Sequence, residues 1–508
     1  MSLNHSVKTI LGYDNVGRDT IIDVECFLSN NLPNIVIVGF ANKSVDEAKE
    51  RIRGALSSSN IKLPRKRITI NLAPADIPKK GSSFDLAIAL AIVQSASMVA
   101  GRTQDSIVIG ELSLDGRVRP VRGIIGKILA GKKIGYKNFI IPKDNLKQAK
   151  LIPGVHLLAI GGFEEIYKKL QEPELTFKEN LKTAFKQTAV SVKQSSDLFE
   201  NIAGQERAKR AMVIAAAGNH NIMLNGPPGT GKSMLAKALR SIMPPLDTEE
   251  ILEVTHLHSL ASQNFDRIIS DRPIRTPHHS SSQVSIIGGG SNPKPGEITL
   301  SHNGILLFDE FPEFNRSVVE SLRQPLEDKE ITVARAKDTI NFPANFILVA
   351  TANPCPCGNF NTSQECNCPA NSIIRYQKRI SGPVFDRIDL YVDVDNVEHS
   401  SLLDPKVTKE NRSASLQQKV AKIRRKQLDR AGKLNSQLTN QDLKNSSRLV
   451  KNSKLLLDQA AKKMNLSARG YMRTLRVAST IADLNDSEKI TEAEVAEALQ
   501  YRKRPVAA

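Results

Sequence analysis

The sequence predicts an α/β fold in which a parallel sheet carries a phosphate-binding loop and a helical domain follows. Residues 226–233 read Gly-Pro-Pro-Gly-Thr-Gly-Lys-Ser, with an apolar strand pattern before them and a helical pattern after them. Apolar runs at 305–308 and 346–352 have the composition of buried parallel strands. Helical patterns resume over 413–502, where we expect a lid on the sheet.

The loop at 226–233 matches G-x-x-x-x-G-K-[ST], the pattern that binds the phosphates of a nucleoside triphosphate. Its glycines let the backbone curl and aim its N–H groups at the phosphates. Lys232 would reach the β- and γ-phosphates of ATP, and the Ser233 hydroxyl would ligate Mg²⁺. The strand is expected at 221–225 and the helix at 234–243. The predicted nucleotide-binding residues of the loop are Gly226, Pro227, Pro228, Gly229, Thr230, Gly231, Lys232 and Ser233.

Acidic and amide side chains follow the other two predicted strands. Asp309 and Glu310 end the first apolar run, and Asn353 follows the second. Because the carboxyl ends of parallel strands meet at one edge of a sheet, these side chains should lie beside the loop. Asp309 would hold Mg²⁺, Glu310 would polarise the attacking water, and Asn353 would keep that water in line with the γ-phosphate. The sequence therefore predicts one site for ATP and Mg²⁺.

Further motifs are spread over most of the chain. They read Ile-Ala-Gly-Gln at 202–205, Arg-Thr-Pro-His-His at 275–279, Gly-Gly-Gly at 288–290, Pro-Gly-Glu-Ile at 295–298, Ser-Gly-Pro at 381–383, Asp-Arg-Ile-Asp-Leu at 386–390 and Ser-Ala-Arg-Gly-Tyr at 467–471. In this order they resemble the AAA+ ATPases, and within them the magnesium-chelatase-like branch. The chain is similar to the YifB/ComM family of bacterial competence-associated ATPases, whose ComM members are DNA branch-migration helicases.

That resemblance implies a homo-oligomeric ring, with a hexamer as the expected form. Arg387, beside Asp386, would be the arginine that reaches the γ-phosphate of a neighbouring subunit. Arg469 resembles the nucleotide-sensing arginine of the lid, and Gln205 belongs to the motif that contacts the nucleotide. A surface salt bridge is the alternative for either arginine.

The charge of the chain favours a polyanionic partner, and DNA is the first candidate. The formal net charge is +18, from 71 Lys and Arg against 53 Asp and Glu. Aromatic residues make up 5% and Trp is missing, which favours contacts to the DNA backbone over base stacking. A predicted hairpin at 331–342 places Arg335 and Lys337 at its turn. We expect this hairpin and the insert at 280–298 to face a ring channel and to contact single-stranded or branched DNA.

The N-terminal region resembles the proteolytic domain of Lon proteases, an S5 domain 2-like fold. The resemblance is carried by Gly-Glu-Leu-Ser-Leu-Asp-Gly-Arg-Val at 110–118 and by Pro-Lys-Lys-Gly-Ser-Ser at 78–83, where Ser83 matches the Lon nucleophile. A Ser-Lys dyad needs a lysine amine to take the hydroxyl proton. The matching position is Ile125, and Lys127 lies two residues further on, which on a helix points to a different side. We therefore expect a Lon-like domain without peptidase activity.

Four of the five cysteines fall in one short segment after Asn353. Cys355, Cys357, Cys366 and Cys368 form C-x-C-x8-C-x-C, and four thiols this close can make a tetrahedral zinc site. C-x-C gives a tighter bite than the usual C-x2-C, so free reduced thiols are the alternative.

We expect three domains joined by one linker, in a chain without a signal pattern. The most apolar stretch, 86–93, is too short to span a bilayer, so the expected location is cytoplasmic, with no membrane partner. The predicted segments are the Lon-like domain at 1–172, a lysine-rich linker at 173–198, the AAA+ ATPase domain at 199–395 and the helical lid at 396–508.

These observations favour an ATP-driven ring motor that acts on DNA, a branch-migration helicase in recombination during natural transformation. Two alternatives stay open. One is a chelatase-like ATPase that remodels a partner protein. The other is an ATP-dependent Lon-like protease, which Ile125 disfavours.

Overall fold

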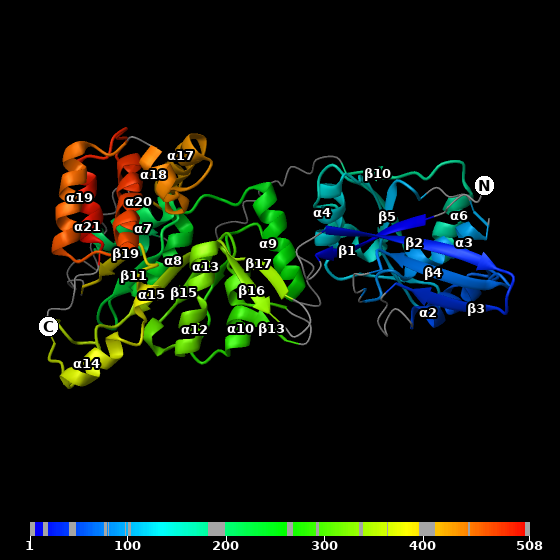
Figure 1. Ribbon diagram of the computed structural model, residues 1–508, viewed down its shortest axis with the longest axis horizontal. Coiled ribbons are helices and arrows are strands. Elements are labelled where there is room, and N and C mark those ends of the chain that lie inside the picture. Colours follow the sequence, from blue (N-terminus) through cyan, green and yellow to red (C-terminus); the bar gives the residue numbers. More distant parts are fainter. Residues whose placement is uncertain are drawn as a thin grey trace. The chain divides into compact units, whose positions relative to one another are not determined.

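The structure, a computed structural model, is mixed α/β and forms two compact units that are described separately (Figure 1). The first unit comprises Met1–Thr188, Thr248–Ile269 and Ala334–Asn341, and the second comprises Ala189–Asp247, Ser270–Val333 and Phe342–Ala508. The residues described are 6–13, 19–39, 47–75, 79, 81–96, 98–99, 103–180, 199–261, 268–290, 294–334, 339–362, 364–395, 412–445 and 448–502.

The first unit is built on a mixed sheet whose described strands run in the order β10-β9-β8-β5-β1-β2-β4-β3. Strand β1 pairs antiparallel with β2 and parallel with β5, which places it in the middle of the sheet. The strands are β1 (Ser6–Tyr13), β2 (Asp19–Ser29), β3 (Asn34–Val38), β4 (Arg67–Ala73), β5 (Ser106–Val108), β8 (Asn138–Pro142), β9 (His156–Ile160) and β10 (Lys178–Glu179), with β6 (Glu111–Leu112) and β7 (Val118–Arg119) as a separate pair.

Two helices, α3 (Asp85–Ser95) and α4 (Ile124–Ile134), pack on this sheet. They have little polar surface because their sequences are apolar on more than one face. In α3 the residues from Asp85 to Gln94 are all buried. In α4 the buried residues include Ile124, Ile125, Lys127 and Ile128. The other helices of this unit are α2 (Ala48–Ser58), η1 (Lys143–Asn145), α5 (Leu146–Ala149), α6 (Phe163–Gln171) and α9 (Thr248–Ala261).

The second unit contains a parallel sheet in the order β12-β15-β18-β11-β19. All residues of β15 and β18 are buried, as expected for strands covered on both faces. The strands are β11 (Ile222–Asn225), β12 (Ile274–Arg275), β15 (Ile305–Phe308), β18 (Ile347–Ala352) and β19 (Leu390–Asp393). A small two-stranded sheet of β13 (Gly288–Gly289) with β14 (Lys294–Pro295) accompanies it. Strands β16 (Glu330–Ala334) and β17 (Thr339–Pro343) form another two-stranded sheet, whose residues are divided between the two units.

Helices α7 and α8 connect this sheet to the C-terminal helices, because apolar residues of β11, β19, α7, α8, α17 and α20 form one core (Figure 1). Ser467 caps α20 by accepting the Gly470 N–H, and Thr491 with Glu494 forms a capping box on α21. The helices are η2 (Phe199–Asn201), α7 (Glu206–Gly218), α8 (Lys232–Ile242), α10 (Gln283–Ile287), α11 (Glu297–Leu300), η3 (Phe311–Glu313), α12 (Arg316–Ser321), α13 (Arg323–Asp328), α14 (Ala370–Gln377), α15 (Gly382–Phe385), α17 (Ser413–Ala431), η5 (Asn435–Gln437), α18 (Asn440–Asn445), α19 (Lys451–Lys463), α20 (Ala468–Leu484) and α21 (Glu492–Gln500).

The predicted fold class is confirmed, and some boundaries differ from expectation. Strand β10 lies inside the predicted linker, because Lys178 and Glu179 pair with β9. Helix α9 lies in the range predicted as ATPase core but belongs to the first compact unit, where it packs on α4. Over the described part of the chain, none of the helices combines the length and the apolar character needed to cross a bilayer.

A buried ion pair ties the parallel sheet to the lid. Asp389, just before β19, accepts hydrogen bonds from Arg473 Nη1 of α20 at 2.7 Å and from the Asn221 N–H at 2.9 Å. Burial opposes ionisation of Asp389, but the Arg473 guanidinium and the nearby His220, whose Nδ1 lies 3.6 Å away, outweigh it and hold the carboxyl pKa far below its ordinary value.

Replacing this carboxylate should destabilise the second unit. Asp389→Asn leaves the Arg473 guanidinium without its counter-charge, which should cost about 3–5 kcal/mol of unfolding free energy. Because the folded-state pKa is lowered, the contribution is present above the ordinary carboxyl pKa of about 3.9 and is lost as the pH falls below it. Urea unfolding at several pH values measures both effects. Glu497→Gln, which breaks the more exposed pair with Arg210, should cost less than about 1 kcal/mol. Equal losses in the two variants would contradict the account.

Candidate nucleotide-binding site

The loop at 226–231 connects β11 to α8 at the carboxyl edge of the parallel sheet. The Gly226 N–H donates to the Ala352 carbonyl at 3.1 Å, and a Cβ on Gly226 would lie 2.1 Å from the Val394 carbonyl oxygen, so only glycine fits. Gly229 and Gly231 have φ values of 82° and 83°, which side chains strongly disfavour. Helix α8 begins at Lys232, two residues earlier than predicted, so its free N-terminal N–H groups lie directly after the loop.

Lys232 lies at the centre of the loop. Its Nζ donates to the carbonyls of Gly226 at 2.7 Å and Pro227 at 2.6 Å, and to Asn353 Oδ1 at 3.2 Å. Burial lowers the pKa of Lys232, and the charges of Asp309 and Glu310 act in the opposite direction. The loop lysine and the polar residue after β18, predicted separately, therefore meet in one place.

Ser233 and Asp309, the two predicted Mg²⁺ ligands, are hydrogen-bonded to each other. Ser233 Oγ lies 3.1 and 2.9 Å from the two carboxylate oxygens of Asp309. A hydroxyl and a carboxylate side by side at a phosphate-binding loop are the oxygen ligands that Mg²⁺ takes together with phosphate, so the residues present fit a magnesium–nucleotide complex.

Thr351, which sequence reasoning did not single out, links the two acidic residues. Its Oγ1 donates to Asp309 Oδ1 at 2.6 Å and accepts the Glu310 N–H at 2.9 Å. Glu310 has a left-handed backbone with φ of 55°, and its side chain is exposed beside the loop. The sequence did offer a signal for Thr351. The hydroxyl lies near the end of the strand that pairs with β15, at the level of the acids that follow β15.

Gln205 lies close to the beginning of the loop. It is the left-handed residue before α7, with φ of 59°, and its Nε2 donates to the Asp395 carbonyl. Asp395 follows Val394, whose carbonyl faces Gly226. The structure thus brings Gln205, the loop, Asp309, Glu310 and Asn353 to the same edge of the sheet.

Comparison with known proteins agrees with this arrangement. The chain matches three family profiles, described as magnesium chelatase subunit ChlI at 198–402, subunit ChlI of Mg-chelatase at 24–145, and the C-terminal part of subunit ChlI at 410–502. It is 41% identical over 488 residues to the competence protein ComM of Haemophilus influenzae, which covers 95% of this chain and 94% of that protein. It is 38% identical over 489 residues to YifB of Escherichia coli, with the same shares covered. The chain belongs to the YifB/ComM family.

Membership in the YifB/ComM family makes the chain an AAA+ ATPase of the magnesium-chelatase type, a class that works with ATP and Mg²⁺ and assembles into oligomers. The N-terminal region is also 27% identical over 188 residues to the Lon protease of Leptospira interrogans, a match that covers 34% of this chain and 22% of that protein. The resemblance to a Lon-like N-terminal domain is therefore shown.

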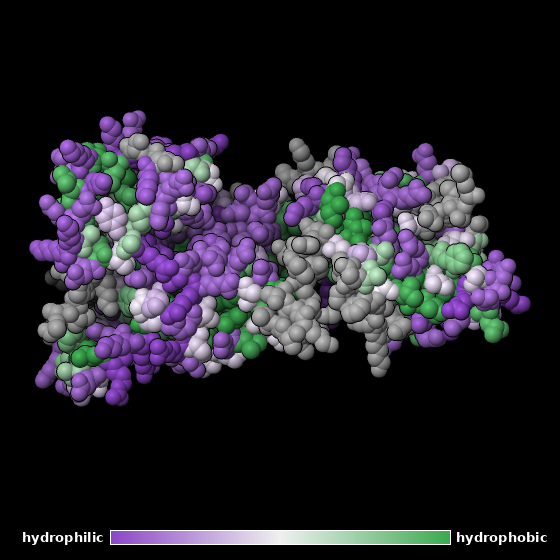
Figure 2. Space-filling view, in the orientation of Figure 1, coloured by the Kyte–Doolittle hydropathy of each residue, from purple (hydrophilic) through white to green (hydrophobic). Residues whose placement is uncertain are grey.

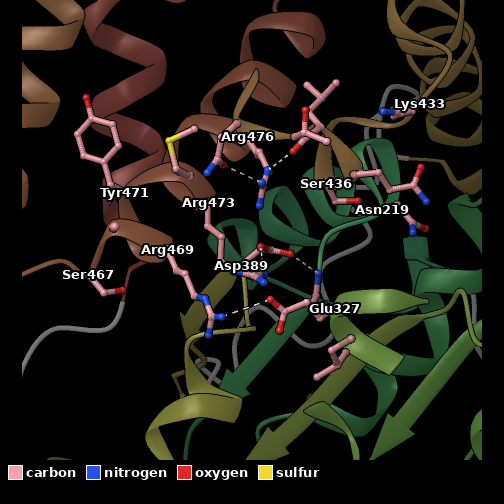
Figure 3. Close-up of a pocket in the computed structure, with 18 of the residues that line it drawn as sticks. Asn219, Glu327, Asp389, Lys433, Ser436, Ser467, Arg469, Tyr471, Arg473 and Arg476 are labelled. Atoms are coloured by element: carbon pink, nitrogen blue, oxygen red, sulfur yellow. Dashed lines mark hydrogen bonds and ion pairs between the residues drawn. The ribbon is translucent and has the colours of Figure 1, made fainter. Parts of the chain in front are cut away.

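The predicted trans-acting arginine, Arg387, and the predicted nucleotide-sensing arginine, Arg469, lie together at the opposite edge of the sheet from the loop. Arg387 Nη2 pairs with Glu327 Oε2. Arg469 Nη2 lies 3.4 Å from Glu327 Oε1 (Figure 3). Arg387 also donates from Nη1 to the Pro383 carbonyl at 2.7 Å. Glu327 was not predicted, because its partners are 60 and 142 positions away in sequence and nothing local marks it.

A basic cavity of about 960 Å³ lies beside this arginine pair, between the amino edge of the sheet and the lid (Figure 3). Arg469 points to Glu327 on one side of it, and Arg473 points to Asp389 deeper in (Figure 3). The cationic residues that line it are Lys329, Lys433, Lys444, Arg469, Arg473 and Arg476.

The structure of the Lon-like unit contradicts the prediction that no lysine amine lies beside Ser83. Lys127, not residue 125, faces Ser83, with Nζ to Oγ at 3.4 Å. Ile125 lies in an apolar core cluster instead. The two residues do point to different sides of α4, as predicted, but α4 is buried on several sides, and Lys127 is on the side that faces β1 and Ser83. The expectation that no amine accompanies Ser83 is therefore wrong.

The remaining predicted site residues are the cysteines and the hairpin turn. The sulfurs of Cys355, Cys357, Cys366 and Cys368 all lie within 4.8 Å of one another. The predicted hairpin forms from β16 and β17, with Ile331, Val333 and Ile340 buried. Arg335 and Lys337 lie outside the described residues.

Replacing Glu310 should separate ATP binding from ATP hydrolysis. Glu310→Gln keeps the loop and its Mg²⁺ ligands, so it should bind a fluorescent ATP analogue normally but release phosphate about 100-fold more slowly or worse, since the general base is gone. Lys232→Ala should lose binding itself. Glu313→Gln is the matched control, because that carboxylate pairs with Arg379 at 2.6 Å, and it should keep both activities. Parental turnover by Glu310→Gln would show that another group activates the water.

Proposed function

We propose that this chain is an ATP-hydrolysing ring motor that acts on DNA, a branch-migration helicase in recombination during natural transformation. The observation that carries the ring is the separation of Arg387 from the phosphate-binding loop. Strands β11 and β19 are parallel and paired from Ile222 with Leu390 to Asn225 with Asp393. Arg387 precedes β19 and the loop follows β11, so the two lie at opposite edges of the sheet.

The distance between these edges disfavours a cis contact. Four strand residues at about 3.3 Å each already separate them by about 13 Å, and the lysine of the loop lies further on. We therefore infer that Arg387 reaches the γ-phosphate bound by a neighbouring subunit, which is how ring ATPases of this type complete their site. Glu327 holds Arg387 and Arg469 side by side, so one neighbour would deliver both.

Within one subunit, the residues take the roles that their positions favour. Ser233 and Asp309 would hold Mg²⁺, which neutralises phosphate charge when bound. Lys232 and the N–H groups of the loop would bind the phosphates, and Gln205 would contact the nucleotide. Glu310 would take the proton of the attacking water, with Thr351 holding its backbone and Asn353 orienting the water.

Two observations favour DNA over a protein as the object of the motor. The formal net charge is +18, which favours a polyanion. Figure 2 shows hydrophilic side chains, of either charge, over much of the face of the second unit in view. A relative of nearly the same length is named a competence protein. The chelatase-like remodeller is the alternative, because all three family profiles derive from magnesium chelatase.

DNA should stimulate ATP turnover if the proposal holds. We expect faster phosphate release with single-stranded or branched DNA, while Lys232→Ala stays inactive with either. Arg335→Glu or Lys337→Glu should weaken DNA binding and reduce its salt dependence by about one unit of slope per lost phosphate contact. ATP turnover that no DNA changes, with an unchanged slope in both variants, would favour a protein remodeller.

Mixing two inactive variants tests the trans arginine. Arg387→Ala and Lys232→Ala should each be inactive alone, yet together recover part of the ATP turnover, because some interfaces pair an intact loop with an intact arginine. Arg379→Ala, whose arginine pairs with Glu313 in its own subunit, is the control and should stay active alone. No recovery in rings shown to contain both variants would count against Arg387.

A second candidate activity of the Lon-like unit is peptide hydrolysis with Ser83 as the nucleophile. The contact between Ser83 and Lys127 favours it. Both side chains are buried, and burial lowers the pKa of Lys127 to about 8. Lys127 Nζ also donates to the carbonyls of Ile10 at 3.1 Å and Leu11 at 2.7 Å, contacts that favour the ammonium form. At neutral pH the lysine is therefore mainly a donor, and it becomes a base only above its pKa.

The pH dependence of Ser83 labelling distinguishes the two states of this unit. If Lys127 acts as a base, labelling by a fluorophosphonate probe should rise through pH about 8 and disappear in Ser83→Ala. Ser82→Ala, one residue away, should label like the parent. If Ser83 stays unlabelled on both sides of that pH, the unit is catalytically silent despite the contact.

A further inference from the structure

We propose that Cys355, Cys357, Cys366 and Cys368 bind one structural zinc ion, and that the loop it closes braces the phosphate-binding loop. The four cysteines lie between β18 and α14 in the second unit, and nothing in the ATP chemistry above uses them.

The distances between the sulfurs fit a tetrahedral metal. Cys355 Sγ lies 3.4 Å from Cys357 Sγ and 3.7 Å from Cys366 Sγ, and the last two are 3.6 Å apart. With a Zn–S bond of about 2.3 Å, two ligands of a tetrahedral site lie about 3.8 Å apart. All four sulfurs lie within 4.8 Å of one another, so a single ion can contact each of them.

Apolar burial does not explain this convergence. Only Cys355 is buried, while Cys357 is exposed and Cys366 and Cys368 are half-buried. Two short C-x-C segments, nine residues apart between Cys357 and Cys366, come together at the surface of the loop. Cysteines gathered in the open, with sulfurs near the spacing of metal ligands, indicate a metal site more than a small apolar cluster.

Regular secondary structure does not order the described part of this loop. Its described residues from 353 to 369 form no helix and no strand, and irregular loops beyond about 12–15 residues are uncommon in compact domains unless something holds them. Gln377 Nε2 of α14 donates to the Pro354 carbonyl at 3.0 Å, and other contacts lie within the loop. The Phe360 N–H donates to Cys355 Sγ at 3.3 Å, and the Gly358 N–H donates to the Cys355 carbonyl at 3.0 Å. A zinc ion would contribute the cross-link that ties the two segments together.

The loop contacts the ATP site at two points. Gly358, with φ of 88°, packs so closely on Pro228 that a Cβ would lie 2.4 Å from Pro228 Cδ. Asn353, two residues before the first cysteine, accepts a hydrogen bond from Lys232 at 3.2 Å. Zinc would therefore help to fix the position of Pro228 in the phosphate-binding loop, through Gly358, and the position of Asn353.

Metal analysis tests the zinc ion without any use of ATP or DNA. The full-length protein, purified without metal-affinity resin and dialysed, should contain one zinc per chain. Cys357→Ser and Cys366→Ser should lose it, while Cys26→Ser, the fifth cysteine, should keep it. Cobalt in place of zinc should give the visible bands of a tetrahedral thiolate site. A parent protein that holds no zinc and gives no cobalt–thiolate bands overturns the proposal.

Gly358→Ala tests the bracing separately. It should retain one zinc per chain but bind a fluorescent ATP analogue on the order of tenfold more weakly, because the new methyl group displaces Pro228. Gly432→Ala carries a similar backbone cost, since Gly432 has φ of 64° with nothing within 4 Å of its Cβ position, and it should bind normally. Equal nucleotide affinity in the two variants would contradict the bracing of the phosphate-binding loop and would not affect the zinc assignment. Both readouts are independent of DNA and of ring assembly, so a failed helicase proposal would not affect them.

Discussion

The parallel register of the sheet in the second unit is the constraint on which the rest of the site depends. Because β15, β18, β11 and β19 all run in one direction, the residues that follow them meet at one edge and the residues that precede them meet at the other. The carboxyl edge holds the phosphate-binding loop with its acidic and amide partners. The amino edge holds Arg387. One subunit therefore carries the phosphate-binding loop at one edge of the sheet and Arg387 at the other, and we propose that the two act in ATP sites shared with different neighbours.

The lid stabilises the amino edge by charge as well as by packing. Asp389, just before β19, pairs with Arg473 of α20, and Glu327 contacts both Arg387 and Arg469. Arg469 lies on α20 as well, so a movement of this helix relative to the sheet would displace Arg469 and Arg473 together. In the proposed ring, this arrangement would give a physical route by which the nucleotide state at one interface acts on the lid of the neighbour.

Much of the ATP site could be predicted from the sequence, because each part is local. The loop, the acids after β15 and Asn353 after β18 are contiguous motifs, and parallel strands bring them together without further information. What could not be predicted depends on long-range packing. Lys127 was not expected to face Ser83, because helical spacing does not reveal how many sides of α4 are covered. Thr351 and Glu327 carry no motif, and β10 is too short to differ in composition from a linker.

The central claim is that a single subunit cannot complete its own ATP site, and the dependence of specific ATPase activity on protein concentration tests it most directly. If Arg387 acts on a neighbour, turnover per chain should be negligible where mass photometry finds only monomers, then rise and reach a plateau as rings form. Constant turnover per chain across that range, including under monomeric conditions, would contradict the account.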